Sequence, residues 1–191
     1  MRTNFIKVSS MILLAGILIM SSCKSTKGLT PKEAGEVLIQ TYCSGDEFKS
    51  TAKALRFSAI GESMDQMTAK KKAMSEAKAG LAGSINTLIK GVTDNYVKSV
   101  NFDNKEELLK NYEGLNREVI NQSLNGTIVI CEKTTKTKEG NYKTYVCIEL
   151  DGNEIFQTIN NKATNNEMLK VDYNYEKFKK TFEEEMSKMN K

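Results

Sequence analysis

The chain contains no histidine and no tryptophan among its 191 residues. Histidine is the commonest general base and the commonest metal ligand in proteins, so its absence removes the usual centre of acid–base and metal chemistry. The sequence also lacks a glycine-rich phosphate loop and the ligand spacings of metal sites. We therefore expect no enzyme: no catalytic residue, no cofactor and no metal.

An excess of one charge is missing as well. Without residues 1–22, which hold two of the 28 basic residues and none of the 24 acidic ones, the formal charge balance is +2. The only basic run, Lys70 to Lys72, would point in three directions on a helix. Nucleic-acid binding requires a basic stripe, so we expect no nucleic-acid partner.

No apolar run is long enough to cross a bilayer, which takes about 20 residues. The longest one, residues 11–20, follows two positive charges, Arg2 and Lys7, and precedes small residues. A charged start, a short apolar run and then small residues are typical of a secretory signal peptide.

The end of this segment, from Met20 to Cys23, resembles the bacterial lipobox, in which small residues precede a cysteine that receives diacylglycerol. Met20 stands where that pattern more often has leucine. The resemblance implies signal cleavage between Ser22 and Cys23 and attachment to a membrane through lipidated Cys23. Stable anchoring takes two or more acyl chains, which a diacylglycerol together with an N-acyl group supplies. The alternative is an ordinary signal peptide with a chance cysteine at its end.

The chain is expected to have three parts: a signal peptide at 1–22, a lipidated tether at 23–34 and a single domain at 35–191. Lys24 occupies the position after the cysteine. In lipoproteins resembling this one, a residue other than aspartate there favours transfer to the outer membrane. No acidic cluster follows Cys23, which favours an orientation toward the periplasm and leaves exposure at the cell surface open.

The pattern of the domain predicts an α+β fold. Residues 36–42 and 55–60 are β-like runs, and Ser63 and Gln66 form a capping box that opens a helix reaching Ser99. The apolar stripe of this helix has spacings of three and four residues: Ala69, Ala73, Ala77, Leu81, Ile85, Leu88, Val92 and Tyr96. Because alanines let a helix approach closely, we expect this long helix to pack closely against a sheet.

Two further amphipathic patterns follow. One begins after residues 101–104, which form a helix N-cap, and the other covers residues 173–190 at the C-terminus. The C-terminal stripe is expected to pack on its own domain rather than on another chain. It consists of Tyr175, Phe178, Phe182, Met186 and Met189.

The clearest strand pair is a β-hairpin of residues 127–133 and 142–150, in which Gly140 supplies the left-handed position of the loop. With Thr137 opposite Asn141, the register places Ile128 opposite Leu150 and Ile130 opposite Ile148, on one apolar face. On the other face Cys131 falls opposite Cys147, and we expect this to be a non-hydrogen-bonded pair, whose side chains lie closest.

This register predicts a cross-strand disulfide between Cys131 and Cys147, which an oxidising compartment permits. The alternative is that both cysteines are reduced and fill space as small hydrophobes. Cys43 has no histidine to lower its pKa, so we do not expect a reactive thiolate there.

The carboxylates do not form a candidate acid–base pair. Glu132 and Glu149 are placed on opposite faces of the hairpin, and Glu183 to Glu185 diverge on a helix. A solvated surface is the expected role of the glutamate run.

Together these motifs resemble the LPP-twenty-type bacterial lipoproteins. The residues that carry the resemblance are Arg56–Phe57 before Gly61–Ser63, the helix of Ala69, Ala73, Ala77, Leu81 and Ala82, Thr93–Tyr96, Ile130–Lys133, Gly140–Tyr145, and Tyr175–Phe178 to Met186. The resemblance implies a compact, dodecin-like α+β unit in which one long helix lies across a small antiparallel sheet. It also implies a membrane-associated or outer-membrane lipoprotein without an agreed biochemical activity. True dodecins bind flavin between tryptophans, which this chain lacks, so flavin binding is not expected.

Two functions remain as hypotheses. The first is a structural or assembly protein of the cell envelope that forms a homo-oligomer, or binds an envelope protein, through an exposed sheet face, a free strand edge or the terminal helix. The second is a periplasmic module that binds a protein, glycan or lipid partner on a sheet face that includes Val129, Tyr145 and the cysteine pair.

Overall fold

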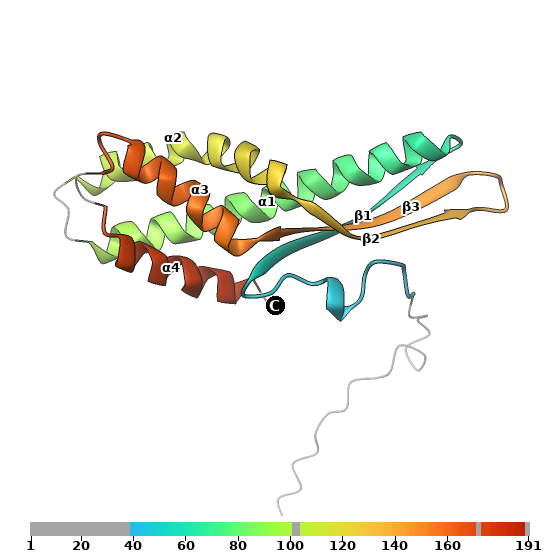
Figure 1. Ribbon diagram of the computed structural model, residues 1–191, viewed down its shortest axis with the longest axis horizontal. Coiled ribbons are helices and arrows are strands. Elements are labelled where there is room, and N and C mark those ends of the chain that lie inside the picture. Colours follow the sequence, from blue (N-terminus) through green and yellow to red (C-terminus); the bar gives the residue numbers. More distant parts are fainter. Residues whose placement is uncertain (1–38, 101–103, 171–172, 190–191) are drawn as a thin grey trace, which may run out of the picture. The chain divides into compact units, whose positions relative to one another are not determined.

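The computed structural model describes three stretches of the chain: residues 39–100, 104–170 and 173–189. The predicted signal peptide, the tether with Cys23 and the first residues of the domain, up to residue 38, lie outside the described residues. Within them the chain forms one three-stranded sheet and four α-helices, which confirms the α+β class (Figure 1).

The sheet is antiparallel and has the order β1-β3-β2. Its strands are β1 (Ala54–Ser63), β2 (Ile128–Lys136) and β3 (Tyr142–Asp151). The strand predicted at 36–42 is absent from its described part, residues 39–42. Strand β3 is therefore central, and β1 and β2 are the two edges.

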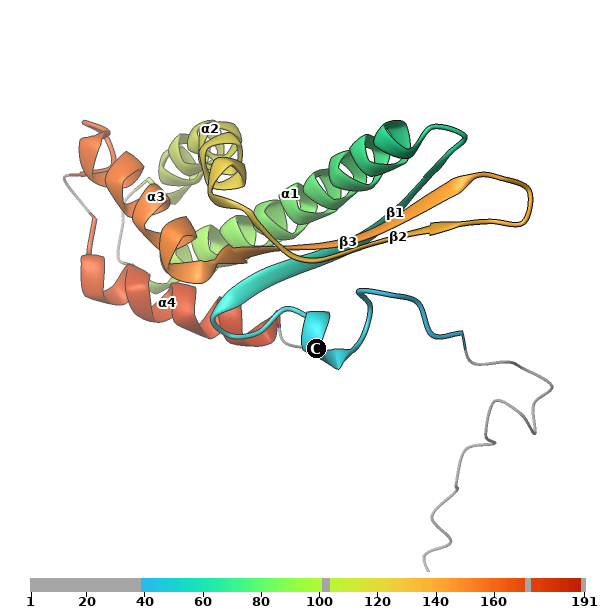
Figure 2. The ribbon, with the colours of Figure 1, turned by 45° about the vertical axis from the view of Figure 1, so that its right-hand side comes forward.

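Helix α1 (Gln66–Ser99) covers one face of the sheet along its first half (Figure 2). All eight residues of the predicted stripe are buried. The approach is close because a Cβ at Gly61 of β1 would lie only 2.2 Å from the carbonyl oxygen of Ala69. The predicted capping box is wrong in detail: Asp65, not Ser63, is the N-cap and accepts a hydrogen bond from the Thr68 N–H at 2.8 Å. A carboxylate is an equally good N-cap and suits the positive end of the helix dipole.

The other helices gather around the second half of α1 (Figures 1 and 2). They are α2 (Lys105–Ser123), α3 (Gly152–Asn165) and α4 (Tyr175–Lys188), with the short 3-10 turns η1 (Asp46–Phe48) and η2 (Leu124–Gly126) in the connections. None of the helices in the described part of the chain has both the length and the apolar character to cross a membrane. The C-terminal helix packs inward as predicted, with Phe178, Phe182 and Met186 buried.

An aromatic cluster joins α1, α2 and α4. The ring of Phe178 lies 5.1 Å from that of Tyr96 and is stacked on that of Tyr112 at 5.9 Å. Burial raises the pKa values of Tyr112 and Tyr173, which keeps both phenols protonated. This cluster closes the end of the core that lies away from the sheet.

The hairpin has the predicted register only near its turn. From Cys131 to Lys136 each residue lies opposite its predicted partner, and Gly140 has the expected positive φ of 94°. Beyond Cys131 a β-bulge shifts the register, so Ile128 lies opposite Glu149 rather than Leu150. The extra residue moves the start of β2 to the opposite faces. Val129 now lies opposite buried Ile148, and the predicted apolar and ligand-binding faces are both wrong at this end of the strand.

Candidate functional site

The face of the sheet opposite α1 is crossed by residues 39–53, which we call the strap. The Tyr42 ring packs edge-on against the Tyr145 ring of β3 at 5.3 Å. The Ser58 hydroxyl of β1 donates a hydrogen bond to the carbonyl oxygen of Cys43. The strap therefore occupies much of the sheet face that the sequence offered for a binding partner.

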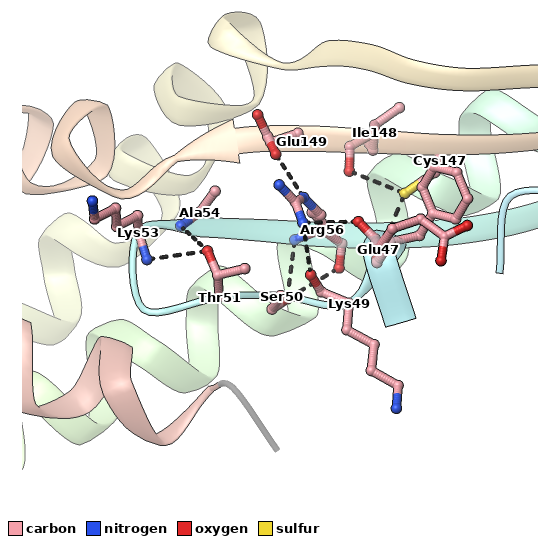
Figure 3. Close-up of polar contacts among 11 residues, drawn as sticks. Glu47, Lys49, Ser50, Thr51, Lys53, Ala54, Arg56, Cys147, Ile148 and Glu149 are labelled. Atoms are coloured by element: carbon pink, nitrogen blue, oxygen red, sulfur yellow. Dashed lines mark hydrogen bonds and ion pairs between the residues drawn. The ribbon is translucent and has the colours of Figure 1, made fainter. Parts of the chain in front are cut away.

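Arg56, on this face of β1, holds the middle of the strap (Figure 3). Its Nε donates to Glu149 Oε2 at 2.6 Å, and its Nη1 donates to the carbonyl oxygens of Glu47 and Lys49 at 2.9 and 3.2 Å. The Ser50 hydroxyl accepts a hydrogen bond from the Arg56 N–H and donates one to its carbonyl oxygen. Both side chains of the Arg56–Glu149 ion pair are about four-fifths buried. Charged hydrogen bonds at a partly buried site are the stronger ones, so this group is a structural clamp on the strap.

A disulfide between Cys43 and Cys131 ties the strap to β2. The predicted Cys131–Cys147 disulfide is wrong, although the two cysteines do lie opposite each other. The Thr137 N–H donates to the Asn141 carbonyl at 2.7 Å, and alternation from that bonded pair makes Cys131–Cys147 a hydrogen-bonded pair, not the expected non-hydrogen-bonded one. Cβ atoms in hydrogen-bonded pairs are about 5.5 Å apart, beyond the roughly 3.5–4.5 Å that a disulfide needs.

Cys147 itself is a free, fully buried thiol. Burial raises its pKa, while the Ser58 hydroxyl and the Arg56 charge act in the opposite direction. A protonated and inaccessible thiol fills space as a small hydrophobic side chain. For Cys147, though not for Cys131, this is the alternative that the sequence left open.

The acidic side chains lie apart. Glu132 pairs with Lys70 of α1 at 2.8 Å, and Glu149 pairs with Arg56 across the opposite face, as the sequence predicts. On α4, Glu183 is exposed, whereas Glu185 accepts a hydrogen bond from the Asn95 amide at 2.7 Å. Among the described residues no three His, Cys, Asp or Glu side chains gather in a way that could hold a metal ion.

A cavity of about 490 Å³ opens where the strap ends, between the start of α3 and α4. Its floor is apolar, formed chiefly by Phe156, Phe182 and Met186, and its rim carries Lys53 and Lys179 with two acidic residues. The size lies within the usual range of pockets for small molecules. This concave site was not predicted, because its walls come from segments far apart in the sequence.

The outer edge of β1 is partly covered by the protein itself. Backbone groups that point away from β3 belong to the even-numbered residues, as the Ser50–Arg56 contacts show. Thr51 satisfies both backbone groups of Ala54, and Lys72 Nζ donates to the carbonyl oxygen of Glu62. These contacts block strand pairing at Ala54 and Arg56 and occupy the Glu62 carbonyl, whereas the outward backbone groups of Ser58 and Ile60 have no hydrogen-bond partner among the described residues.

No described residue covers the outer edge of β2. Because Cys131, Lys133 and Thr135 are bonded to β3, the backbone groups of Glu132, Thr134 and Lys136 point outward. Within the described part of the chain these six N–H and C=O groups have no hydrogen-bond partner. All three residues are exposed, and the Glu132 side chain, paired with Lys70, keeps a third of its surface accessible. Strand β2 therefore offers a free template for strand pairing.

Sequence reasoning missed the roles of Arg56 and Cys43. An arginine between two apolar residues of a strand signals a charged group on a sheet face, but its partners on the strap lie up to nine residues away. Cys43 was the unpaired cysteine in an odd set of three, which could have signalled a long-range disulfide.

The chain matches no known family, no curated protein and no solved structure.

Proposed function

We propose that this chain is a lipid-anchored protein of a bacterial cell envelope, and that its folded unit is a structural module that assembles with other protein chains rather than a catalyst. The lipid is carried by Cys23. The outer membrane, with the domain facing the periplasm, is the proposed location.

The anchor is supported by the N-terminal sequence alone. Arg2 and Lys7, the apolar run at 11–20 and the small residues before Cys23 follow the order of a lipoprotein signal. Residues 24–28 after the cysteine are polar or small, as a tether requires.

The observation that carries the assembly role is the uncovered edge of β2. A strand edge whose six outward backbone groups have no hydrogen-bond partner in the described ranges is a ready template for another chain, and soluble monomers usually protect such edges. The arrangement of a long helix across a small antiparallel sheet is also compatible with the dodecin-like resemblance, and such a topology makes oligomers geometrically easy because a strand edge is available for pairing.

The anchor is tested with Cys23→Ala expressed in a bacterial host, with Lys24→Ala as the matched control. We expect the first variant to leave the membrane fraction and the second to remain. Recovery of Cys23→Ala in membranes with an unmodified N-terminus would contradict lipid anchoring.

Assembly is tested by native mass spectrometry of the full-length protein in mild detergent over a series of concentrations. We expect a closed oligomer that persists on dilution. A single chain at all concentrations would refute self-assembly and leave an envelope partner as the remaining form of this function.

A second candidate function, a binding module, is favoured by the cavity at α3 and α4. Its apolar floor fits a small apolar ligand. The test is titration with an environment-sensitive apolar dye, comparing Asn153→Trp, which puts a bulky side chain on the exposed rim, with Asn161→Trp on the exposed surface of α3. Dye binding lost only in the rim variant would support this function, and equal binding by both would exclude the cavity as the site.

A further inference from the structure

The charges along the free edge of β2 are arranged symmetrically about Thr134. Glu132 precedes it by two residues and Lys136 follows it by two. The three side chains share the face that α1 covers, because Glu132 reaches Lys70 of α1 and the Thr134 hydroxyl lies 3.1 Å from that of buried Thr144. Their backbone N–H and C=O groups are the ones that point outward.

We propose that a second copy of this chain pairs with β2 antiparallel, with Thr134 of one copy opposite Thr134 of the other; this inference rests on the proposed assembly function. In this register Glu132 of each copy lies opposite Lys136 of the other. The six outward backbone groups of each strand meet six of the second copy, which joins the two sheets into one of six strands.

The charges select this register over its neighbours. Moving the two-fold centre from Thr134 to Glu132 would place two carboxylates opposite each other, and moving it to Lys136 would oppose two ammonium groups. A centre at Lys133 would oppose the two Lys133 side chains. A centre at Thr135 would place Lys136 opposite Thr134 and Glu132 opposite Lys138 of the turn. Only the register centred on Thr134 matches opposite charges at both positions. Threonines opposite each other are themselves a favourable cross-strand pair.

The existing contacts of these side chains are compatible with the pairing. Lys70 binds Oε1 of Glu132, and a carboxylate accepts bonds from more than one lysine. Lys136 Nζ lies 5.1 Å above the Tyr142 ring, which keeps it on the same face. Lysine on an edge strand normally discourages pairing, so a second chain must supply a carboxylate at that position, as Glu132 of a second copy does.

The edge of β1 is a poorer site for a second copy. Ser50 and Thr51 of the strap occupy the positions that a second strand would take beside Arg56 and Ala54. Helix α1 also lies directly above β1 at Gly61. The β2 edge has neither obstacle along Glu132 to Lys136.

The first experiment cross-links the full-length protein in its membranes with a short bis-maleimide. Thr134→Cys is expected to give a band of two chains on a denaturing gel, because the two introduced thiols lie opposite each other. Lys138→Cys, equally exposed in the turn, is the control and is expected to give none. Absence of the two-chain band for Thr134→Cys would overturn the proposed register.

The second experiment exchanges charges and does not depend on an introduced thiol. Lys136→Glu alone and Glu132→Lys alone each oppose like charges twice and are expected to weaken dimerisation by roughly ten- to a hundredfold. Co-expression of the two variants matches the charges again and is expected to restore a mixed dimer, seen by native mass spectrometry.

The outcomes separate this inference from the function on which it rests. If the wild-type protein is an oligomer and the charge variants leave it unchanged, assembly uses another surface and only the β2 pairing fails. If the wild-type protein is a single chain at every concentration, the self-assembly role fails with it.

Discussion

Replacing Gly61 with alanine is expected to separate the long helix from the sheet. An ideal Cβ at this position would lie 2.2 Å from the Ala69 carbonyl oxygen and 2.4 Å from the Ala73 nitrogen. Real Cβ atoms essentially never approach another heavy atom closer than 3.0 Å, and both obstacles are backbone atoms that no side-chain rotation removes. Helix α1 must therefore move by roughly 1 Å, which forfeits a quarter to a half of the dispersion energy of the contacts it opens.

Overpacking of this kind costs about 1–3 kcal/mol, and the better strand propensity of alanine offsets a small part of it. We expect Gly61→Ala to lower the free energy of unfolding by about 2 kcal/mol. For a domain of this size that corresponds to a fall in Tm of about 4–8 °C. The assay is urea unfolding followed by circular dichroism, with thermal unfolding as a second measurement.

Gly83→Ala is the matched control on α1. A Cβ at Gly83 would meet nothing within 4 Å, so the substitution removes only the entropic disadvantage of glycine in a helix. We expect a gain of roughly 0.5–1 kcal/mol. Changes of opposite sign in the free energy of unfolding, a loss for Gly61→Ala and a gain for Gly83→Ala, would support the close packing of the helix on the sheet. A Gly61→Ala protein as stable as the wild type would refute it.

Three further predictions concern the strap and the aromatic cluster. Arg56→Ala leaves the Glu149 carboxylate, about four-fifths buried, without its cation and releases two strap carbonyls. Urea unfolding is therefore expected to show a loss of about 1.5–3 kcal/mol in the free energy of unfolding, and a change below about 0.5 kcal/mol would contradict the clamp. Cys43→Ser removes a disulfide that joins residues 88 apart, for which loop entropy sets an upper limit of about 4.6 kcal/mol. We expect the free energy of unfolding to fall by about 2–4 kcal/mol. Dithiothreitol should lower the stability of the wild type by the same amount and leave that of the variant unchanged. Tyr112 and Tyr173 stay protonated in the folded protein above their ordinary pKa near 10, whereas the unfolded chain ionises there and binds fewer protons. Stability is therefore expected to fall as the pH rises above about 10, and Tyr112→Phe should make that fall shallower.

The long helix was predictable because its information is local. A stripe at spacings of three and four residues defines one face whatever lies against it, and its three alanines indicated close approach to a sheet. The partner of that approach was not predictable to the residue. The stripe does not specify that Gly61 of β1 lies under Ala69, as the structure shows.

The hairpin shows where local reasoning stops. Turn chemistry set the register from Gly140 outward, and it held as far as Cys131. The bulge beyond that point has no signal in the sequence, since Ile128, Val129 and Ile130 are all apolar and fit either face. A uniformly apolar run specifies register weakly, because a slip by one residue exposes no polar group to the core.

The predicted disulfide is wrong for a different reason, the assignment of hydrogen-bonded and non-hydrogen-bonded pairs along the hairpin. Cys131 and Cys147 are opposite each other, as predicted, but the bonded pair at Thr137 and Asn141 makes every second pair toward Cys131 a bonded one as well. The third cysteine, Cys43, then became the better partner because the strap crosses the sheet at that point. A contact over 88 residues depends on the whole fold, and periodicity carries no trace of it.

The free edge of β2 depends on both the strand order and the pattern of hydrogen-bonded pairs. Glu132 and Lys136 are unremarkable in the sequence, since alternating charges on a strand normally mean a solvated face. Their spacing becomes informative only from the structure. Strand β3 is central, so β2 is an edge strand, and the alternation of hydrogen-bonded pairs turns the backbone groups of Glu132 and Lys136 outward. Glu132 and Lys136 lie equally far from Thr134 and carry opposite charges. An antiparallel strand that complements them must carry the same two charges at the same spacing, and β2 of a second copy is such a strand. If the charge-swapped variants pair with each other and not with themselves, the symmetry of this short segment is the reason.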